Sequence, residues 1–112
     1  MDTTNRQTGR TTKQLRAMLE HLRANQDDQA LFVTLDERMA VQAREMLNDL
    51  APDAAWYGTR RIVWRSVQQR SASLRGYRFD YVDFDHCADE FASDRAAEMR
   101  AELPAFMAAS VA

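Results

Sequence analysis

The feature that most constrains this fold is a short run, residues 30–35 (Ala-Leu-Phe-Val-Thr-Leu), that is apolar on both faces of an extended strand. A strand of this kind is buried on both sides, which is typical of parallel sheets covered by helices above and below. Residues 61–67 and 79–84 are predicted to form two more strands. The chain is therefore expected to build a small sheet around a fully buried strand.

Amphipathic helices are predicted before and after the first strand, because apolar residues repeat there at helical spacing. The first helix covers residues 11–24 and can be capped by Thr11 or Thr12. Its apolar stripe consists of Leu15, Met18, Leu19 and Leu22. The second helix follows Asp36 as its cap and reaches about residue 50.

The last third of the chain contains a further predicted helix. It begins at about Asp89, turns Phe91 or Ala92 inward and is interrupted by Pro104. Residues 68–76 are polar and are predicted to be loop or a short helical turn.

Strands that alternate with helices predict an α/β fold. We expect a small three-layer sandwich with a short, mainly parallel sheet of about three strands, flanked by helices. A chain of 112 residues has room for one domain. We therefore predict a single domain over residues 1–112, with a flexible N-terminus at residues 1–4 and a C-terminal tail segment at residues 104–112.

Composition and charge exclude several classes of protein. The net charge of −2 by itself argues for neither a nucleic-acid coat nor a membrane-surface protein. The polar first residues are no secretory signal, and the longest apolar run, residues 30–33, is too short to cross a bilayer. A single cysteine, Cys87, rules out an internal disulfide, and we expect a cytoplasmic protein.

Residues 5–12 (Asn-Arg-Gln-Thr-Gly-Arg-Thr-Thr) have the features of a phosphate-binding turn at the start of a helix. Gly9 would allow backbone N–H groups to converge, and Gly9, Arg10, Thr11 and Thr12 would hold the phosphates. The strict pattern is G-x-x-x-x-G-K-[ST], so Thr4 stands in place of its first Gly and Arg10 in place of its Lys.

A phosphate turn needs an acidic partner for Mg²⁺, at the carboxyl end of a neighbouring strand. Asp85 follows the predicted strand at residues 79–84 and meets this requirement. We expect Thr11 and Asp85 to share the Mg²⁺ shell, with His86 beside the γ-phosphate.

Two segments together resemble a known family. Residues 74–86 (Leu-Arg-Gly-Tyr-Arg-Phe-Asp-Tyr-Val-Asp-Phe-Asp-His) resemble the Walker B region of helicase-like motors and phage large-terminase ATPases. Residues 5–12 are similar to the terminase form S-R-Q-x-G-K-T-T of the Walker A motif. The resemblance covers roughly residues 5–90 and implies a truncated P-loop NTPase-like domain.

The resemblance also implies a function. ATP and Mg²⁺ would be the cofactors, Asp85 and His86 the catalytic residues, and the protein a phage or prophage accessory protein in the host bacterial cytoplasm. His86 stands where the family has its catalytic Glu, and we expect the domain to lack the family's second lobe with its arginine finger. We therefore expect binding of nucleotide or phosphate without efficient hydrolysis.

Two other functions remain open from the sequence. In the first, the domain binds no nucleotide and is a protein-interaction module that docks on a host or phage protein or forms a homodimer. In the second, it is a weak Mg²⁺-dependent ATPase.

A stretch without acidic residues carries six arginines, with Trp64 and Tyr77 among them. They are Arg60, Arg61, Arg65, Arg70, Arg75 and Arg78. These residues could form a groove for single-stranded nucleic acid. The favoured alternative is that they pair with the acidic segment at residues 80–102, within the chain or across a dimer.

The sequence Asp85-His86-Cys87, with Asp89 and Glu90 nearby, could suggest a metal site. A structural zinc site uses four ligands at paired spacings, whereas the chain has two histidines and one cysteine. A structural zinc site is therefore not predicted.

Overall fold

The computed structural model describes residues 3–25, 27–52, 61–69 and 71–107, and for residues 3–8, 71 and 72 it describes the backbone alone. Three strands form one sheet: β1 (Ala30–Thr34), β2 (Ile62–Ser66) and β3 (Tyr81–Phe84). Their order is β2-β1-β3, and both pairings are parallel. The predicted small parallel sheet is confirmed. Every residue of the central strand β1 is buried, which explains why its sequence has no polar face.

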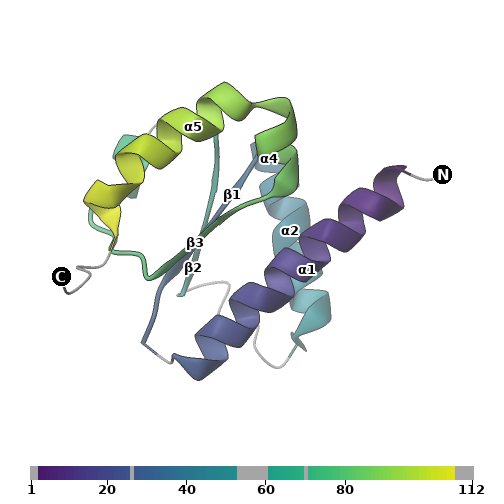
Figure 1. Cartoon of the computed structure of the whole chain (residues 1–112). Coiled ribbons are helices and arrows are strands. Elements are labelled where there is room, and N and C mark those ends of the chain that lie inside the picture. The colour runs from purple at the N-terminus through teal and green to yellow at the C-terminus, as the bar shows by residue number, and fades with distance from the viewer. Residues whose placement is uncertain (1–2, 26, 53–60, 70, 108–112) are drawn as a thin grey trace.

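Helices cover both faces of the sheet (Figure 1). One face carries α1 (Thr3–Ala24) and α2 (Glu37–Leu50). The other carries α4 (His86–Phe91), α5 (Ser93–Glu102) and the short 3₁₀ helices η2 (Ser71–Leu74) and η3 (Leu103–Phe106). The predicted three-layer α/β sandwich is confirmed.

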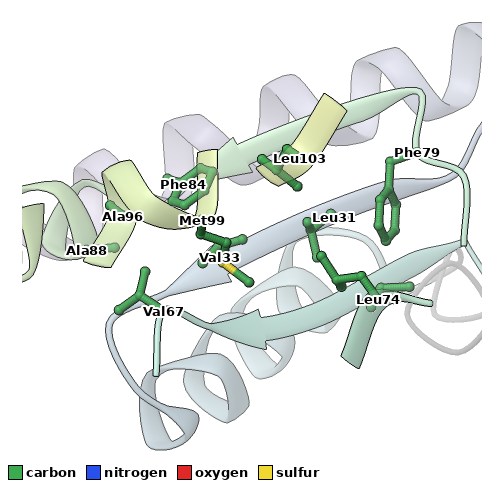
Figure 2. Close-up of a cluster of buried hydrophobic side chains, with 11 residues drawn as sticks. Leu31, Val33, Val67, Leu74, Phe79, Phe84, Ala88, Ala96, Met99 and Leu103 are labelled. Carbon is green, nitrogen blue, oxygen red and sulfur yellow. The ribbon is translucent and has the colours of Figure 1, made fainter. Parts of the chain in front are cut away.

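Each layer boundary has its own apolar core. On the α1–α2 side, Phe32 is fully buried together with Leu15, Met18 and Leu22 of α1 and Leu47 of α2. On the opposite side, β1 contributes Leu31 and Val33, which pack with residues between β2 and β3, such as Leu74 and Phe79, and with residues from Phe84 to Leu103 (Figure 2). Alternate residues of β1 therefore enter different cores, as the period of a strand requires.

Helix α1 begins at Thr3, and the predicted start at Thr11 was wrong. Gly9 lies inside the helix, where a Cβ atom would meet nothing within 4 Å. Thr3 and Thr4, which were predicted to belong to a flexible terminus, are the first residues of α1. A glycine lowers helix stability by only about 1 kcal/mol, so it does not end a helix whose remaining residues are compatible with one.

The predicted third helix is two helices. Asp85 caps α4 by accepting a hydrogen bond from the Cys87 N–H, so the helix begins at His86 and not at Asp89. Ala92 has non-helical angles (φ −144°, ψ 47°) and separates α4 from α5. Phe91 is 63% exposed, so Ala92 is the inward residue of the predicted pair.

The chain after α5 returns to the sheet. Pro104 lies in the first turn of η3, where its missing N–H is not needed. The Phe79 N–H donates to the Phe106 carbonyl at 2.8 Å, and Phe79 forms a parallel bridge with Met107. The part of the predicted tail at residues 104–107 thus packs on the body, and residues 108–112 lie outside the described residues.

Candidate functional site

The carboxyl ends of the three strands meet at one edge of the sheet. The chain leaves β1 toward α2 on one face, and it leaves β3 toward α4 on the opposite face. Such a divergence is the topological switch point at which α/β proteins bind ligands. Asp85 lies at this edge of the sheet, where its N–H donates to the Val33 carbonyl of β1 at 2.8 Å.

Thr11 and Asp85 are in direct contact at this edge. The Thr11 hydroxyl donates to Asp85 Oδ1 at 2.6 Å, across 74 residues of sequence. Thr11 is 8% exposed and Asp85 1% exposed, so the bond is shielded from water. The sequence placed these two residues in one site, and the structure brings them together.

The second carboxylate oxygen of Asp85 is also used. Oδ2 accepts a hydrogen bond from the Cys87 N–H at 3.3 Å, which satisfies one of the free N–H groups at the start of α4. Asp85 therefore joins three elements: the end of β3, the start of α4 and the middle of α1.

Gln14 supports the same junction and was missed in the sequence. Its Nε2 donates to the Phe84 carbonyl at 2.7 Å, and its Oε1 accepts from the His86 N–H at 3.1 Å. A signal was available, because Thr11 and Gln14 are three residues apart and share one face of α1. No sequence signal identifies the partners of Gln14, since the bonds span 70 and 72 residues.

The predicted phosphate turn does not have the conformation of a turn. Gly9 and Arg10 are exposed residues within α1, and Thr12 is partly buried in the next turn. The N–H groups of Gly9 to Thr12 lie inside the helix, where each N–H bonds the carbonyl four residues earlier. The prediction of a turn is therefore wrong for this structure. Helix α1 nevertheless places Thr11 in contact with Asp85.

Arg10, the residue before Thr11, is exposed and pairs with a carboxylate of α4. Its Nη1 is 2.8 Å from Glu90 Oε1 of α4, and both side chains are about half exposed, at 52% and 42%. An exposed ion pair of this kind contributes about 0–1 kcal/mol, so Arg10 can exchange Glu90 for another anion at little cost.

His86 and Cys87 follow Asp85 into the first turn of α4, and both are buried. Cys87 Sγ lies 3.8 Å from His86 Nδ1. Burial, followed by the charge of Asp85, raises the pKa of the Cys87 thiol to about 11. The thiol is therefore protonated at neutral pH. Side-chain ligand atoms of Asp85, His86 and Cys87 all lie within 4.8 Å of one another.

A separate cavity of about 340 Å³ lies beside β3 on the α5 side. It is lined by Val82, Asp83, Phe84, Arg100, Leu103 and Met107, among others. Burial raises the pKa of the Asp83 carboxyl. The Arg100 guanidinium lies 4.0 Å from the centre of the Phe84 ring and pairs with Asp89.

The predicted arginine groove is only partly within the described residues, because Arg60 and Arg70 lie outside them. Arg61 is 9% exposed, and its guanidinium donates to the carbonyl oxygens of Leu22, Asn25 and Asp28, where α1 ends. Arg65 lies 5.9 Å from the centre of the Tyr77 ring, whereas Arg75 and Arg78 are exposed.

The sequence predicted that these arginines pair with acidic residues at 80–102. Two of those acidic residues pair with other arginines. Glu90 pairs with Arg10, and Asp89 pairs with Arg100. Arg61 was predicted either to contact nucleic acid or to pair with acidic residues. In the structure its guanidinium donates hydrogen bonds to carbonyl oxygens near the end of α1.

Fold and site together define a small three-layer α/β protein with a polar cluster at the carboxyl edge of a parallel sheet. Comparison of the chain with known protein families, with curated proteins and with solved structures finds no match. Among the described residues, no helix has the length and apolar character needed to span a bilayer.

Proposed function

We propose that this protein binds the phosphate groups of a nucleotide together with Mg²⁺, through Thr11 and Asp85, without efficient hydrolysis. The observation that carries the proposal is the buried Thr11–Asp85 hydrogen bond at the switch point of the sheet. A hydroxyl and a carboxylate are the protein ligands that Mg²⁺ uses beside phosphate oxygens.

The distance between the two oxygens suits a shared ion. Neighbouring ligands of an octahedral Mg²⁺ with bonds of about 2.0–2.1 Å are about 2.9 Å apart. Thr11 Oγ1 and Asp85 Oδ1 are 2.6 Å apart, so they need to separate by only a few tenths of an ångström. The hydroxyl proton would turn away from Asp85 as the ion enters.

Phosphate binding by backbone N–H groups would require α1 to unwind before Thr11. Thr11 and Leu15 of α1 are buried, whereas Gly9 and Arg10 are exposed. The N-terminal end of α1 extends past the edge of the sheet (Figure 1). The exposed residues Gly9 and Arg10 lose little packing when this end unwinds, and Gly9 already weakens the helix by about 1 kcal/mol. Arg10 would then move from Glu90 to the phosphates.

Hydrolysis would be inefficient because the catalytic positions are poorly filled. His86 follows Asp85 where related motors would have a carboxylate, and it is buried at 8% exposure. A neutral imidazole is a poorer partner for the attacking water than a positioned carboxylate. A weak ATPase remains a lesser candidate, and release of phosphate that stops in Asp85→Ala would support it.

Thermal melting with and without ATP and Mg²⁺ tests the proposal. A ligand at 100 times its Kd stabilises the native state by about 2.7 kcal/mol, which is a shift of several degrees for a small domain. Thr11→Val should lose the shift. The matched control is Thr34→Val, because Thr34 is also buried but its hydroxyl donates to the Asp36 carbonyl. No shift at millimolar nucleotide, or equal shifts in both variants, would contradict the proposal.

One observation favours protein docking as a second candidate. Phe91 is 63% exposed at the end of α4, next to the Arg10–Glu90 pair. Exposed aromatic residues are enriched in interfaces. Size-exclusion chromatography over a range of concentrations would detect a homodimer, and Phe91→Ala should abolish it. A chain that stays monomeric at every concentration excludes the homodimer.

A further inference from the structure

Three different metal-binding side chains come together at the start of α4. Asp85 offers a carboxylate oxygen, His86 an imidazole nitrogen and Cys87 a thiol sulfur, and these atoms lie within 4.8 Å of one another. Their side chains are 1%, 8% and 2% exposed. Buried groups of this kind are removed from competing water, which strengthens any bond that they make to a cation.

The spacing is close to that of a tetrahedral ion. Bonds of about 2.3 Å from sulfur and 2.0–2.1 Å from nitrogen place these two atoms about 3.5 Å apart at the tetrahedral angle. Cys87 Sγ is 3.8 Å from His86 Nδ1 and 4.0 Å from Nε2, so the imidazole ring would turn to aim one nitrogen at the ion. Rotation of the Asp85 side chain would bring its oxygen into the same shell, since no ligand atom is more than 4.8 Å from the others.

The donor set selects the kind of metal. Mg²⁺ requires oxygen ligands in octahedral geometry, whereas a combination of sulfur, nitrogen and oxygen donors suits Zn²⁺. Three protein ligands with a fourth position for water is the arrangement of catalytic zinc sites, unlike the four-ligand structural sites. We propose that Asp85, His86 and Cys87 bind a borderline-soft divalent cation, and that Zn²⁺ is the ion that best fits them.

Charge is balanced when the ion binds. The thiol of Cys87 gives up its proton to solvent as the sulfur–zinc bond forms, with no change in oxidation state. One thiolate and the Asp85 carboxylate then neutralise the two charges of Zn²⁺, while His86 is a neutral ligand. The buried cluster carries no net charge, so the ion avoids the cost of an uncompensated charge in the interior.

Titration of the full chain with Co²⁺ after removal of metal by a chelator tests the site. Co²⁺ replaces Zn²⁺ and reports its ligands by absorption. We expect saturation at an equimolar ratio, d–d bands of a tetrahedral ion, and a near-ultraviolet thiolate-to-cobalt band that added Zn²⁺ removes. This experiment needs no variant. A spectrum of hexaaqua Co²⁺ throughout the titration would overturn the proposal.

Two histidine variants then locate the ion. His86→Gln should weaken Zn²⁺ binding by more than about 100-fold, because removal of a direct ligand exceeds the 10–100-fold effect of outer groups. His21→Gln is the matched control, since His21 is the other histidine and bonds Asp28 at 2.7 Å, away from the cluster. Circular dichroism would check that both variants fold. Equal losses in both variants would overturn the assignment.

The zinc proposal and the nucleotide proposal both use Asp85, but different variants test them. Cys87→Ser should lose the thiolate-to-cobalt band and keep any thermal shift with ATP and Mg²⁺. Thr11→Val should do the reverse, because three zinc ligands remain. Because Cys87 is the single cysteine, the decisive measurement is affinity: Zn²⁺ binding as tight in Cys87→Ser as in the wild type would overturn the zinc site, whatever the outcome with nucleotide.

Discussion

At the scale of single residues, Asp85 has the most connections in this part of the molecule. It accepts hydrogen bonds from Thr11 and Cys87 and donates its own N–H to β1. A buried carboxylate with both oxygens bonded stabilises the native state, and its loss leaves buried donors without partners. The same residue therefore combines a structural role with the proposed ligand roles.

Asp85→Ala should lower the free energy of unfolding by about 2–4 kcal/mol, because it removes a helix cap and leaves the buried Thr11 hydroxyl unsatisfied. Urea denaturation measures the change. Asp89→Ala is the control, because Asp89 is exposed in its ion pair with Arg100 and its loss should cost less than about 1 kcal/mol. Similar losses in the two variants would contradict the role of Asp85.

Cys87 makes stability depend on pH in the alkaline range. The ordinary pKa of its thiol is 9.0, and burial and then Asp85 raise this pKa to about 11 in the folded chain. The native state thus holds the proton more tightly than the unfolded state. Its contribution is complete below pH 9 and is lost as the pH rises toward 11, by about 2–3 kcal/mol.

The difference between the wild type and Cys87→Ala isolates this effect from other groups that titrate. Unfolding in urea at a series of pH values should show the wild type losing its relative stability between pH 9 and about 11. A difference that stays constant over this range would show that the thiol ionises equally in the folded and unfolded chains.

At the scale of elements, α1 joins the two halves of the sheet. Its apolar stripe packs against β1 and α2, and Thr11 and Gln14 bond the β3–α4 junction. Its end is capped by Arg61, which immediately precedes β2. Each strand of the sheet is therefore linked to the first helix.

Gly9→Ala separates the helical form of residues 3–10 from a phosphate-binding form. Open space surrounds the Cβ position, so the variant should raise the free energy of unfolding by about 0.5–1 kcal/mol. It should also reduce the thermal shift with ATP and Mg²⁺, because the helix becomes harder to unwind. Ala17→Gly, at an exposed position of α1, should lower stability and leave the nucleotide shift unchanged.

Arg61→Met should destabilise the chain by about 2–4 kcal/mol, because three carbonyl groups at the end of α1 lose a charged donor. Arg78→Met is the control, since Arg78 is exposed and donates to the carbonyl of its neighbour Tyr77. Chemical denaturation compares the two. A small effect at Arg61 would show that water can replace the guanidinium there.

At the scale of the whole molecule, the layers follow from the sequence, but several connections do not. The apolar faces of β1 and the helical stripes were sufficient to predict a three-layer fold with a parallel sheet. The site was predicted as a pair, Thr11 with Asp85, from the requirement for a hydroxyl and a carboxylate. The conformation before Thr11 was wrong, because Gly9 is compatible with both a turn and a helix.

The features that were not predicted from the sequence share a physical cause: they leave no residue-specific signal. Gln14 and Arg61 bond backbone carbonyls far away in sequence, and a carbonyl gives no residue-specific signal. The break at Ala92 is marked by neither glycine nor proline.

The two cores should respond as one cooperative unit, because β1 belongs to both. Phe32→Ala should cost about 3–5 kcal/mol, since the ring is fully buried and packs edge-on against Trp64 at 5.7 Å. Phe91→Ala should be nearly neutral, because that ring is exposed.

If the two cores unfold together, circular dichroism and tryptophan fluorescence should give coincident unfolding curves. Separate transitions would show that the two cores unfold independently.

The bonds from Thr11 and Gln14 to residues 84–86 also fix an order of events during synthesis. The first helix leaves the ribosome long before its polar partners have been translated. Until that junction emerges, those side chains remain hydrated, and the helix can dock only through its apolar stripe. Final attachment of α1 therefore waits for the β3–α4 junction, and a nascent chain arrested ahead of β3 should expose Thr11 to solvent.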